Sequence, residues 1–169
     1  KELIFKSQKN PLEIEKLLVS EFETNLYLQK DFRKVIFIHS NNLCTFVPKS
    51  LFDESKLIDY LKFDNKIFES DYVVADEVSG NDIMAVYVPF VNLNNFFFDC
   101  FGGFEYHHAS SIFLNKILNK ANTKTNNLYC NVALSSFELI YIKEGKLNLY
   151  NSFEFNTLED FIYYILFTI

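Results

Sequence analysis

Two of the three histidines in the chain are adjacent, at His107 and His108, with Glu105 just before them. Imidazole and carboxylate groups together suit metal binding or proton transfer at neutral pH. The run reads as a strand, in which neighbouring side chains point to opposite faces, so the two imidazoles are poorly placed to hold one ion. A metal-dependent hydrolase would use one of them with a distant carboxylate. We favour a packed histidine that hydrogen-bonds the backbone and caps the following helix.

Cysteine catalysis needs a thiolate beside an imidazole, and Cys100 with His107 or His108 is the nearest candidate in the sequence. The phenylalanines around Cys100 favour a buried, unreactive thiol instead. Cys44 and Cys130 are far apart and lack the close spacing of a zinc site. We expect all three thiols to be small buried groups in a reducing compartment, which favours the cytoplasm.

Other classes of function are disfavoured by missing motifs and by composition. The sequence contains no nucleophile elbow, P-loop or dinucleotide fingerprint. Nucleic-acid binding relies on clustered Lys and Arg, whereas the 169 residues carry a formal net charge of −6, so we expect no nucleic-acid partner. The apolar run at 161–169 is too short to span a bilayer. We expect no membrane insertion, and a final helix that is buried on every side.

Apolar periodicity and turn residues predict strands that alternate with helices. Helices are predicted at 11–22, 54–61, 92–101 and 110–120, and from about 158 to the end. Strands are predicted at 3–6, 34–39, 43–47, 72–78, 83–88, 104–107, 128–134, 137–143 and 146–153. Short turns predict that 34–39 pairs with 43–47 and that 72–78 pairs with 83–88. The last three strands follow one another closely and predict a meander before the final helix.

The two ends of the chain resemble each other. Asn10-Pro11-Leu12-Glu13 matches Asn156-Thr157-Leu158-Glu159 at an offset of 156 − 10 = 146, with a predicted strand before each and a helix after each. Self-similarity at long range indicates duplication. Shared capping chemistry at strand-to-helix junctions is an alternative explanation. If the duplication is real, the first copy keeps only the third strand of its meander, and its first two strands are missing upstream.

Three blocks of residues carry a family resemblance: VPF followed by NNF, then FGGFEYHH, then NSF ahead of EDFIYY. Nearly the whole chain resembles the bacterial domain-of-unknown-function family 3822. The resemblance implies an α/β fold, a duplicated actin-like (RNase H-like) fold with mixed sheets flanked by helices. The first half would occupy residues 1–125 and lack its first two strands, and the second half would begin at 126–169. The wider group includes nucleotide-dependent machines and pilus-assembly scaffolds, whereas the family itself has no assigned activity.

The resemblance also points to a phosphate-binding turn. Actin-like halves bind phosphate between their first two strands through Asp-x-Gly followed by a hydroxyl residue. In the second half, Asn131 stands in place of that carboxylate and Ala133 in place of the glycine. Asn131, Ser135 and Ser136 are the candidate residues for ATP with magnesium, although a plain turn is the simpler interpretation. An RNase H-type nuclease needs a metal cluster that begins with a carboxylate on the first strand. Asn131 occupies that place here, which disfavours a nuclease.

These features predict a pseudo-ATPase, which is a non-catalytic scaffold or interaction protein with an actin-like fold and no cofactor. Its partner would be another protein or a second copy, because Phe96-Phe97-Phe98 and Tyr163-Tyr164 exceed what one helix stripe hides. A helix buried between two sheets explains these aromatic runs equally well. The alternative function is a nucleotide-binding actin-like ATPase whose phosphate turn lies upstream. The metal-dependent hydrolase ranks below both.

Overall fold

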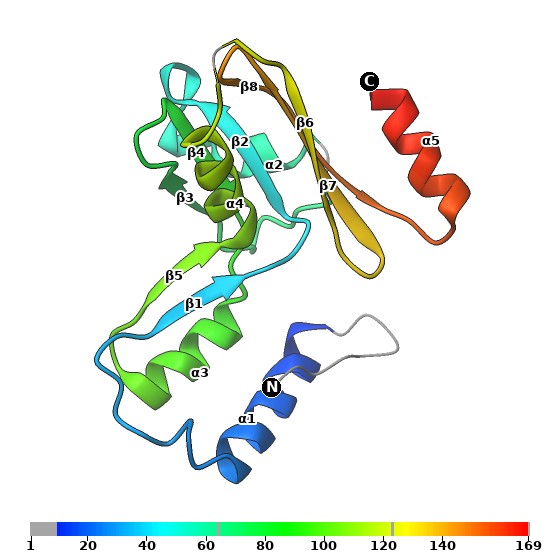
Figure 1. Ribbon diagram of the computed structural model, residues 1–169. Coiled ribbons are helices and arrows are strands. Elements are labelled where there is room, and N and C mark those ends of the chain that lie inside the picture. Colours follow the sequence, from blue (N-terminus) through cyan, green and yellow to red (C-terminus); the bar gives the residue numbers. More distant parts are fainter. Residues whose placement is uncertain (1–9, 64, 123, 169) are drawn as a thin grey trace. The chain divides into compact units, whose positions relative to one another are not determined.

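The chain forms two compact units in a computed structural model, which describes residues 10–63, 65–122 and 124–168 (Figure 1). The first unit contains the residues up to His39 together with Pro89–His107. The second contains Ser40–Val88 together with His108–Ile169. The strand predicted at 3–6 lies outside the described residues. The boundary predicted between residues 125 and 126 separates two copies of a duplicated unit, whereas the division found here separates two compact units. The predicted boundary therefore stays a prediction.

The first unit is built on two helices and a two-stranded sheet. Helix α1 spans Pro11–Thr24 and helix α3 spans Val91–Phe101, while strand β1 (Ile36–His39) pairs with strand β5 (Glu105–His108). The ring of Phe22 on α1 meets three rings of α3 edge-on, at centroid distances of 5.0, 6.0 and 5.6 Å, and these belong to Phe96, Phe97 and Phe101. Edge-to-face contacts of this kind add to the free energy gained from burial. Most of the aromatic run at 96–98 therefore serves the core of this unit.

Helix α1 begins with the cap that the sequence predicts. The Asn10 side chain accepts a hydrogen bond from the Glu13 N–H at 2.9 Å, and the Glu13 carboxylate accepts one from the Asn10 N–H at 3.0 Å. The final helix, α5 (Leu158–Thr168), begins in the same way, with Thr157 and Asp160 as the reciprocal pair. The two caps correspond at an offset of 157 − 10 = 147, one residue from the offset of the sequence match. Common capping chemistry is therefore sufficient to explain the resemblance between the two ends, and the duplication stays a prediction.

His39 is an almost fully buried histidine at the end of β1. Its Nδ1 accepts a hydrogen bond from the Phe90 N–H at 3.4 Å, so the proton resides on Nε2, which donates to the Asn94 side-chain oxygen at 2.9 Å. Burial lowers the pKa of His39, and the hydrogen bond to Asn94 offsets only part of that shift. The folded chain therefore holds this imidazole neutral.

Acidification is expected to destabilise the protein through His39. The unfolded chain takes up a proton on this imidazole near the ordinary pKa of about 6.5, whereas the folded chain does so only at lower pH. The unfolded state binds more protons in that window. The free energy of unfolding therefore decreases as the pH is lowered, by at most about 1.4 kcal/mol per pH unit. Urea denaturation at about pH 7 and about pH 5 should show a smaller pH effect for His39→Gln than for the wild type. An equal effect in both proteins would contradict this assignment.

The second unit contains two three-stranded antiparallel sheets. Strand β4 (Ile83–Tyr87) lies between β2 (Cys44–Pro48) and β3 (Val74–Glu77), and strand β7 (Ser136–Lys143) lies between β6 (Asn127–Val132) and β8 (Lys146–Glu154). The β3–β4 pair and the meander confirm the predicted pairings. The turn between β7 and β8 places Glu144 and Gly145 at positive φ, the geometry that a two-residue hairpin requires.

The hairpin predicted between 34–39 and 43–47 is wrong. Both segments are strands, but β1 pairs with β5 in the first unit and β2 pairs with β4 in the second. Asn41 fixes the chain just before β2, because its side-chain N–H donates to the Val88 carbonyl at 3.1 Å and its oxygen accepts from the Leu43 N–H at 2.9 Å. These bonds place β2 beside β4, which lies much later in the chain. The residues of a local turn do not indicate such a distant partner.

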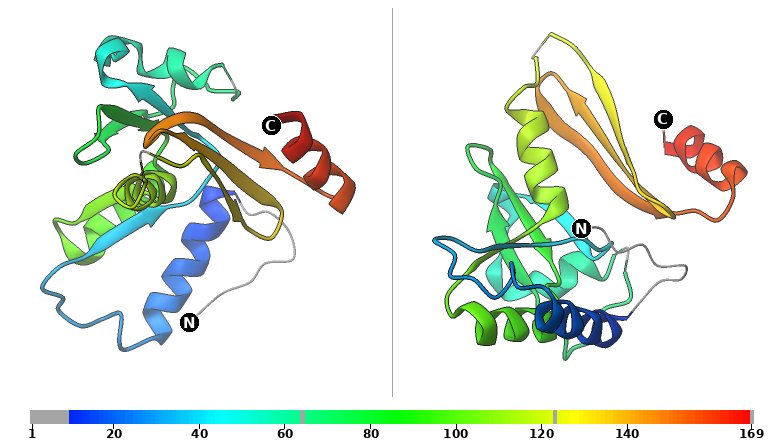
Figure 2. Two further views of the ribbon diagram at one scale, coloured as in Figure 1. Left: turned by 45° about the horizontal axis from the view of Figure 1, so that its top comes forward. Right: turned by 60° about the horizontal axis from the view of Figure 1, so that its bottom comes forward.

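Helix α4 (Ala109–Leu118) packs on the meander and joins the two sheets of the second unit into one core (Figure 2). This core holds Ala85 of β4, Leu114 and Ile117 of α4, and Ile140 and Ile142 of β7, all buried. Strand β7 is the central strand of its sheet, and four of its side chains are fully buried. It therefore positions the residues around it firmly.

Helix α5 departs from its prediction. Its Phe161 and Tyr164 rings contact Phe137 and Phe153 of the meander, at centroid distances of 4.7 and 4.8 Å. The opposite face is exposed, at Leu158, Ile162, Tyr163, Leu166 and Phe167. The expectation of a helix buried on every side is wrong, because only one sheet packs against α5 within the described residues. None of the described helices is long and apolar enough to cross a bilayer.

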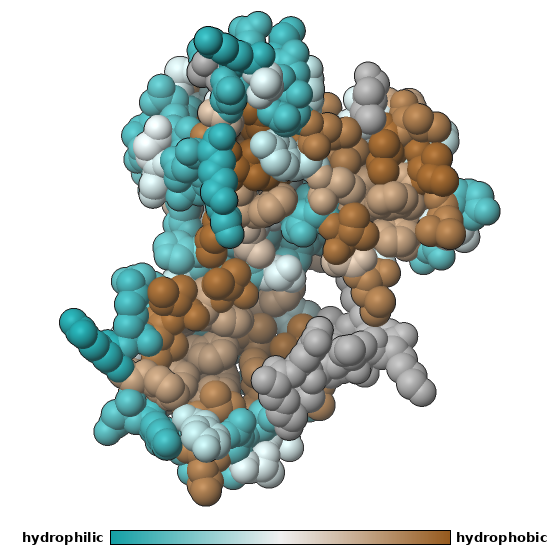
Figure 3. Space-filling model, in the orientation of Figure 1, coloured by the Kyte–Doolittle hydropathy of each residue, from teal (hydrophilic) through white to brown (hydrophobic). Residues whose placement is uncertain are grey.

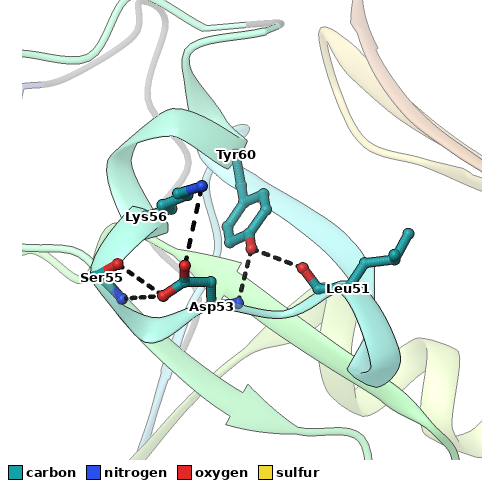
Figure 4. A network of polar contacts seen from close by, with 5 residues as sticks. All are labelled: Leu51, Asp53, Ser55, Lys56 and Tyr60. Atoms are coloured by element: carbon teal, nitrogen blue, oxygen red, sulfur yellow. Dashed lines mark hydrogen bonds and ion pairs between the residues drawn. The ribbon is translucent and has the colours of Figure 1, made fainter.

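The segment after β2 is held by one tyrosine (Figure 4). Two short 3₁₀ turns, η1 (Lys49–Leu51) and η2 (Glu54–Lys56), lead into helix α2 (Leu57–Leu61). The Tyr60 hydroxyl donates to the Leu51 carbonyl at 2.9 Å and accepts from the Asp53 N–H at 2.8 Å. The Asp53 carboxylate accepts from the Ser55 hydroxyl and N–H, which lowers the pKa of Asp53. These bonds position α2, whose Leu61 is buried against β2 and β4.

Candidate functional site

The candidate phosphate turn lies between β6 and β7. Asn131 belongs to β6, Ser135 lies in the turn, and Ser136 is the first residue of β7. The Ala133 N–H donates to the Ser136 carbonyl at 2.8 Å, and the Ser135 carbonyl accepts from the Phe155 N–H at 3.0 Å. The structure therefore brings the three predicted residues together, within a turn that closes on its own backbone.

The side chain of Asn131 is engaged across the sheet. Its residue partner on β7 is Glu138, and the Asn131 side-chain N–H donates to Glu138 Oε2 at 2.8 Å. An aspartate at position 131 would place two carboxylates opposite each other, which is unfavourable on neighbouring strands. The amide is therefore the electrostatic complement of Glu138, and the residue predicted to stand in place of the phosphate-turn carboxylate is used for pairing.

Glu138 is the centre of a larger polar network that joins three elements. Its Oε1 accepts hydrogen bonds from the Ser110 hydroxyl of α4 and from the Tyr150 hydroxyl of β8, the latter at 2.8 Å. The Tyr150 and Ser110 oxygens are themselves 3.3 Å apart. Burial raises the pKa of Tyr150 well above its ordinary value, and the Glu138 charge adds to that shift, so the phenol remains a donor. We did not predict a site at these residues, although the single carboxylate in the apolar strand Phe137–Ile142 was a signal for one.

The two adjacent histidines differ in burial, because His107 on β5 is half-buried and His108 is buried. His108 is buried and caps α4, because its Nδ1 accepts a hydrogen bond from the Ser110 N–H at 3.2 Å. Its Nε2 lies 3.4 Å from the Asn41 side-chain oxygen, and its ring contacts that of Tyr87. The packed, helix-capping histidine that the sequence predicts is confirmed at this position. In residues 10–63, 65–122 and 124–168, no three His, Cys, Asp or Glu side chains gather as a metal site.

The three cysteines do not share one environment. Cys44 is buried, as expected, whereas Cys100 and Cys130 are exposed, so the expectation of burial is wrong for these two. On α3 the rings of Phe96, Phe97 and Phe101 pack against Phe22 and leave Cys100 on the exposed side of the helix. On β6 the alternation of faces exposes Cys130. Partial desolvation, together with the Asp99 charge, raises the pKa of Cys100. This shift disfavours the thiolate that the catalytic hypothesis requires.

The family model of DUF3822, a protein of unknown function, matches residues 1–169. The chain belongs to the DUF3822 family. The predicted resemblance is therefore confirmed over the whole sequence. A search of curated proteins finds no match.

A solved structure shows the fold of this DUF3822 chain. It is a protein from Bacteroides thetaiotaomicron VPI-5482, described as having an actin-like ATPase fold and unknown function. The TM-score is 0.85 at 19% sequence identity, and the match covers 99% of this chain and 66% of that one. The mixed α/β, actin-like fold that the sequence predicts is thus confirmed. This chain spans just under two thirds of the length of that structure, and at this identity the likeness concerns the fold alone.

Proposed function

We propose that this DUF3822 protein is a pseudo-ATPase, a non-catalytic scaffold or interaction protein that uses an actin-like fold to bind a protein partner or a second copy of itself. The finer architecture belongs to the same proposal. Residues 1–125 would represent a first actin-like half without its first two strands, and 126–169 would begin the second half. The meander β6–β7–β8 followed by α5 supports this, because each actin-like half begins with three antiparallel strands and a helix. The acidic charge and unpaired thiols suit the cytoplasm.

The observation that carries the proposal is the Asn131–Glu138 pair. A phosphate turn needs a carboxylate free to hold a metal-bound water and a glycine that lets the backbone approach the phosphate. Here the amide of Asn131 donates to Glu138, and Ala133 occupies the glycine position. This turn therefore lacks both chemical elements of catalysis.

ATP with magnesium is accordingly expected to show no saturable binding to the full-length protein at millimolar ligand, as measured by isothermal titration calorimetry. Saturable binding would contradict the pseudo-ATPase and favour the alternative, a nucleotide-binding actin-like ATPase. That alternative draws support from the description of the solved relative, about a third of which has no counterpart here. If ATP binds, a Ser135→Ala, Ser136→Ala variant shows where it binds. Removal of these two hydroxyls should weaken ATP binding only if the site lies at the β6–β7 turn.

The exposed face of α5 supports an interaction role. Apolar side chains gather over this helix (Figure 3). Leu158, Leu166 and Phe167 are each more than two thirds exposed. A contiguous apolar patch of this kind is typical of a protein interface. The opposite face of α5 is anchored to the meander by Phe161 and Tyr164, so the patch lies on a supported helix.

Leu166→Glu is expected to weaken self-association of the full-length protein by about tenfold or more, because a carboxylate replaces an apolar contact. Size-exclusion chromatography with light scattering over a range of concentrations measures this effect. Leu134→Glu is the matched control, since Leu134 is 81% exposed against 72% for Leu166 and lies in the β6–β7 turn. A wild-type protein that stays monomeric, or an equal effect of both substitutions, would contradict self-association through α5.

A further inference from the structure

A polar pocket of about 170 Å³ lies in the second unit, outside the β6–β7 turn. Strand β2 contributes Thr45 and strand β8 contributes Ser152, and Asn65 reaches the pocket from just beyond α2. Two more amides, Asn42 and Asn151, complete a wall of hydroxyl and amide groups. The volume is smaller than that of pockets for drug-sized ligands, so any ligand here is small.

Some of these groups are already paired and others remain available. The Asn42 side-chain N–H donates to Glu154 Oε1 at 3.0 Å, and the Asn151 side-chain oxygen accepts from the Ser152 N–H at 2.9 Å. Within the part of the chain that the structure describes, no hydrogen bond occupies the hydroxyls of Thr45 and Ser152 or the side chain of Asn65. Each of these three groups both donates and accepts.

The charge of the pocket selects against anions. Glu154 is the single charged side chain among the lining residues, and none of them is Lys, Arg or His. A phosphate or carboxylate would have no cationic partner and would lie near a carboxylate, which is unfavourable. The Glu154 charge is itself held by Asn42, so the pocket does not depend on a cationic ligand for compensation.

Cys44 and Tyr150 also line the pocket, and both carry their protons at neutral pH. Burial raises the pKa of the Cys44 thiol well above its ordinary value, and it does the same for the Tyr150 phenol. The Tyr150 hydroxyl is fixed by Glu138 and Ser110. These two residues therefore present neutral, preorganised groups rather than a nucleophile, which suits binding more than covalent chemistry.

We propose that this pocket binds a small neutral polyol, a molecule of the monosaccharide or sugar-alcohol class. Hydroxyl groups of a polyol donate and accept at once, which matches Thr45, Ser152 and Asn65. An amino acid is a poorer match because its carboxylate finds no cation here, and nucleotide phosphates are excluded for the same reason. The proposal does not depend on the scaffold role, because the pocket and the α5 face are made by different residues.

Titration of the full-length protein with glucose, ribose and glycerol tests the proposal, with saturation-transfer NMR for weak binding and calorimetry for tighter binding. At least one of the three should bind saturably below about 50 mM. Glucose 6-phosphate should bind about tenfold more weakly than glucose, because its phosphate meets Glu154 without a counter-charge. Glu154→Gln should reduce the difference in affinity between glucose and glucose 6-phosphate. It should leave the affinity for glucose within about threefold of the wild-type value.

A double variant, Thr45→Val with Ser152→Ala, removes two free hydroxyls with little change in shape and should weaken polyol binding by about tenfold or more. Ser79→Ala, an exposed serine outside the pocket, is the matched control and should bind as the wild type does. Absence of binding for all three probes overturns the proposal. So does unchanged affinity in the double variant, or glucose 6-phosphate binding as tightly as glucose. The last comparison uses wild-type protein, so it holds even if a variant fails to fold.

Discussion

Replacing Glu138 with alanine is expected to lower the free energy of unfolding by about 3 kcal/mol, because two sheltered hydroxyls lose their charged acceptor together. Ser110 is 2% exposed and Tyr150 is packed against the core, so water cannot readily replace the carboxylate. Asn131 loses its partner too, at lower cost because it is exposed. Urea denaturation followed by circular dichroism measures the loss. A loss of this size would show that the Glu138 network stabilises the packing of α4, β7 and β8.

Glu138→Gln is the matched control, since its amide keeps one acceptor oxygen for the two hydroxyls, while it removes the charge and replaces the other oxygen with an NH₂ donor. We expect it to cost less than half as much as Glu138→Ala. Asn131→Asp should cost about 1 kcal/mol, because it sets two carboxylates opposite each other and removes a donor. Combining Asn131→Asp with Glu138→Gln should recover most of that loss, since one carboxylate again faces one amide. A double variant as unstable as the sum of its parts would contradict direct pairing.

Phe137→Ala is expected to have the largest effect on stability, about 4 kcal/mol, because it empties a well-packed position. Phe137 is 1% exposed, and its ring contacts Phe153, Phe155 and Phe161 at centroid distances of 5.3, 5.8 and 4.7 Å. Loss of the ring removes the support of α5 as well as a core contact. Denaturation monitored by circular dichroism gives the free energy, and hydrogen exchange in α5 shows whether that helix loosens first.

Phe137→Leu is the control for this substitution, because it keeps most of the buried volume and should cost less than half as much. Self-association through α5 should weaken in Phe137→Ala as it does in Leu166→Glu, although position 137 does not belong to the exposed face. If Phe137→Ala left the exchange rates of α5 unchanged, the anchoring of this helix by the meander would be contradicted.

Much of the local structure follows from short segments of sequence. Asn10, Pro11 and Glu13 define the start of α1, and a glycine at Gly102 with φ of 70° ends α3. The turn at Glu144 and Gly145 sets the β7–β8 hairpin. The helix cap at His108 was also predictable, because a histidine directly before a helix can accept from its first N–H groups. Each of these features depends on atoms within a few residues of each other.

Pairing over long distances was not predictable from the same signals. A short polar turn between β1 and β2 indicated a hairpin, but β2 pairs with β4, and the choice is made by side chains that meet only in the folded chain. Glu138 gives a second example. Its acceptors serve Ser110, Asn131 and Tyr150, which come from separate elements, so the network has no compact sequence signature.

The sequence by itself determined the family, the mixed α/β class, and most helices and strands. Only the tertiary structure decided that Asn131 pairs with Glu138, that Cys100 is exposed while Cys44 is buried, and that one face of α5 is open. The physical reason is the range of the interactions. Caps, turns and periodicity act within one element, whereas burial, charge pairing and pocket formation depend on which distant elements pack together.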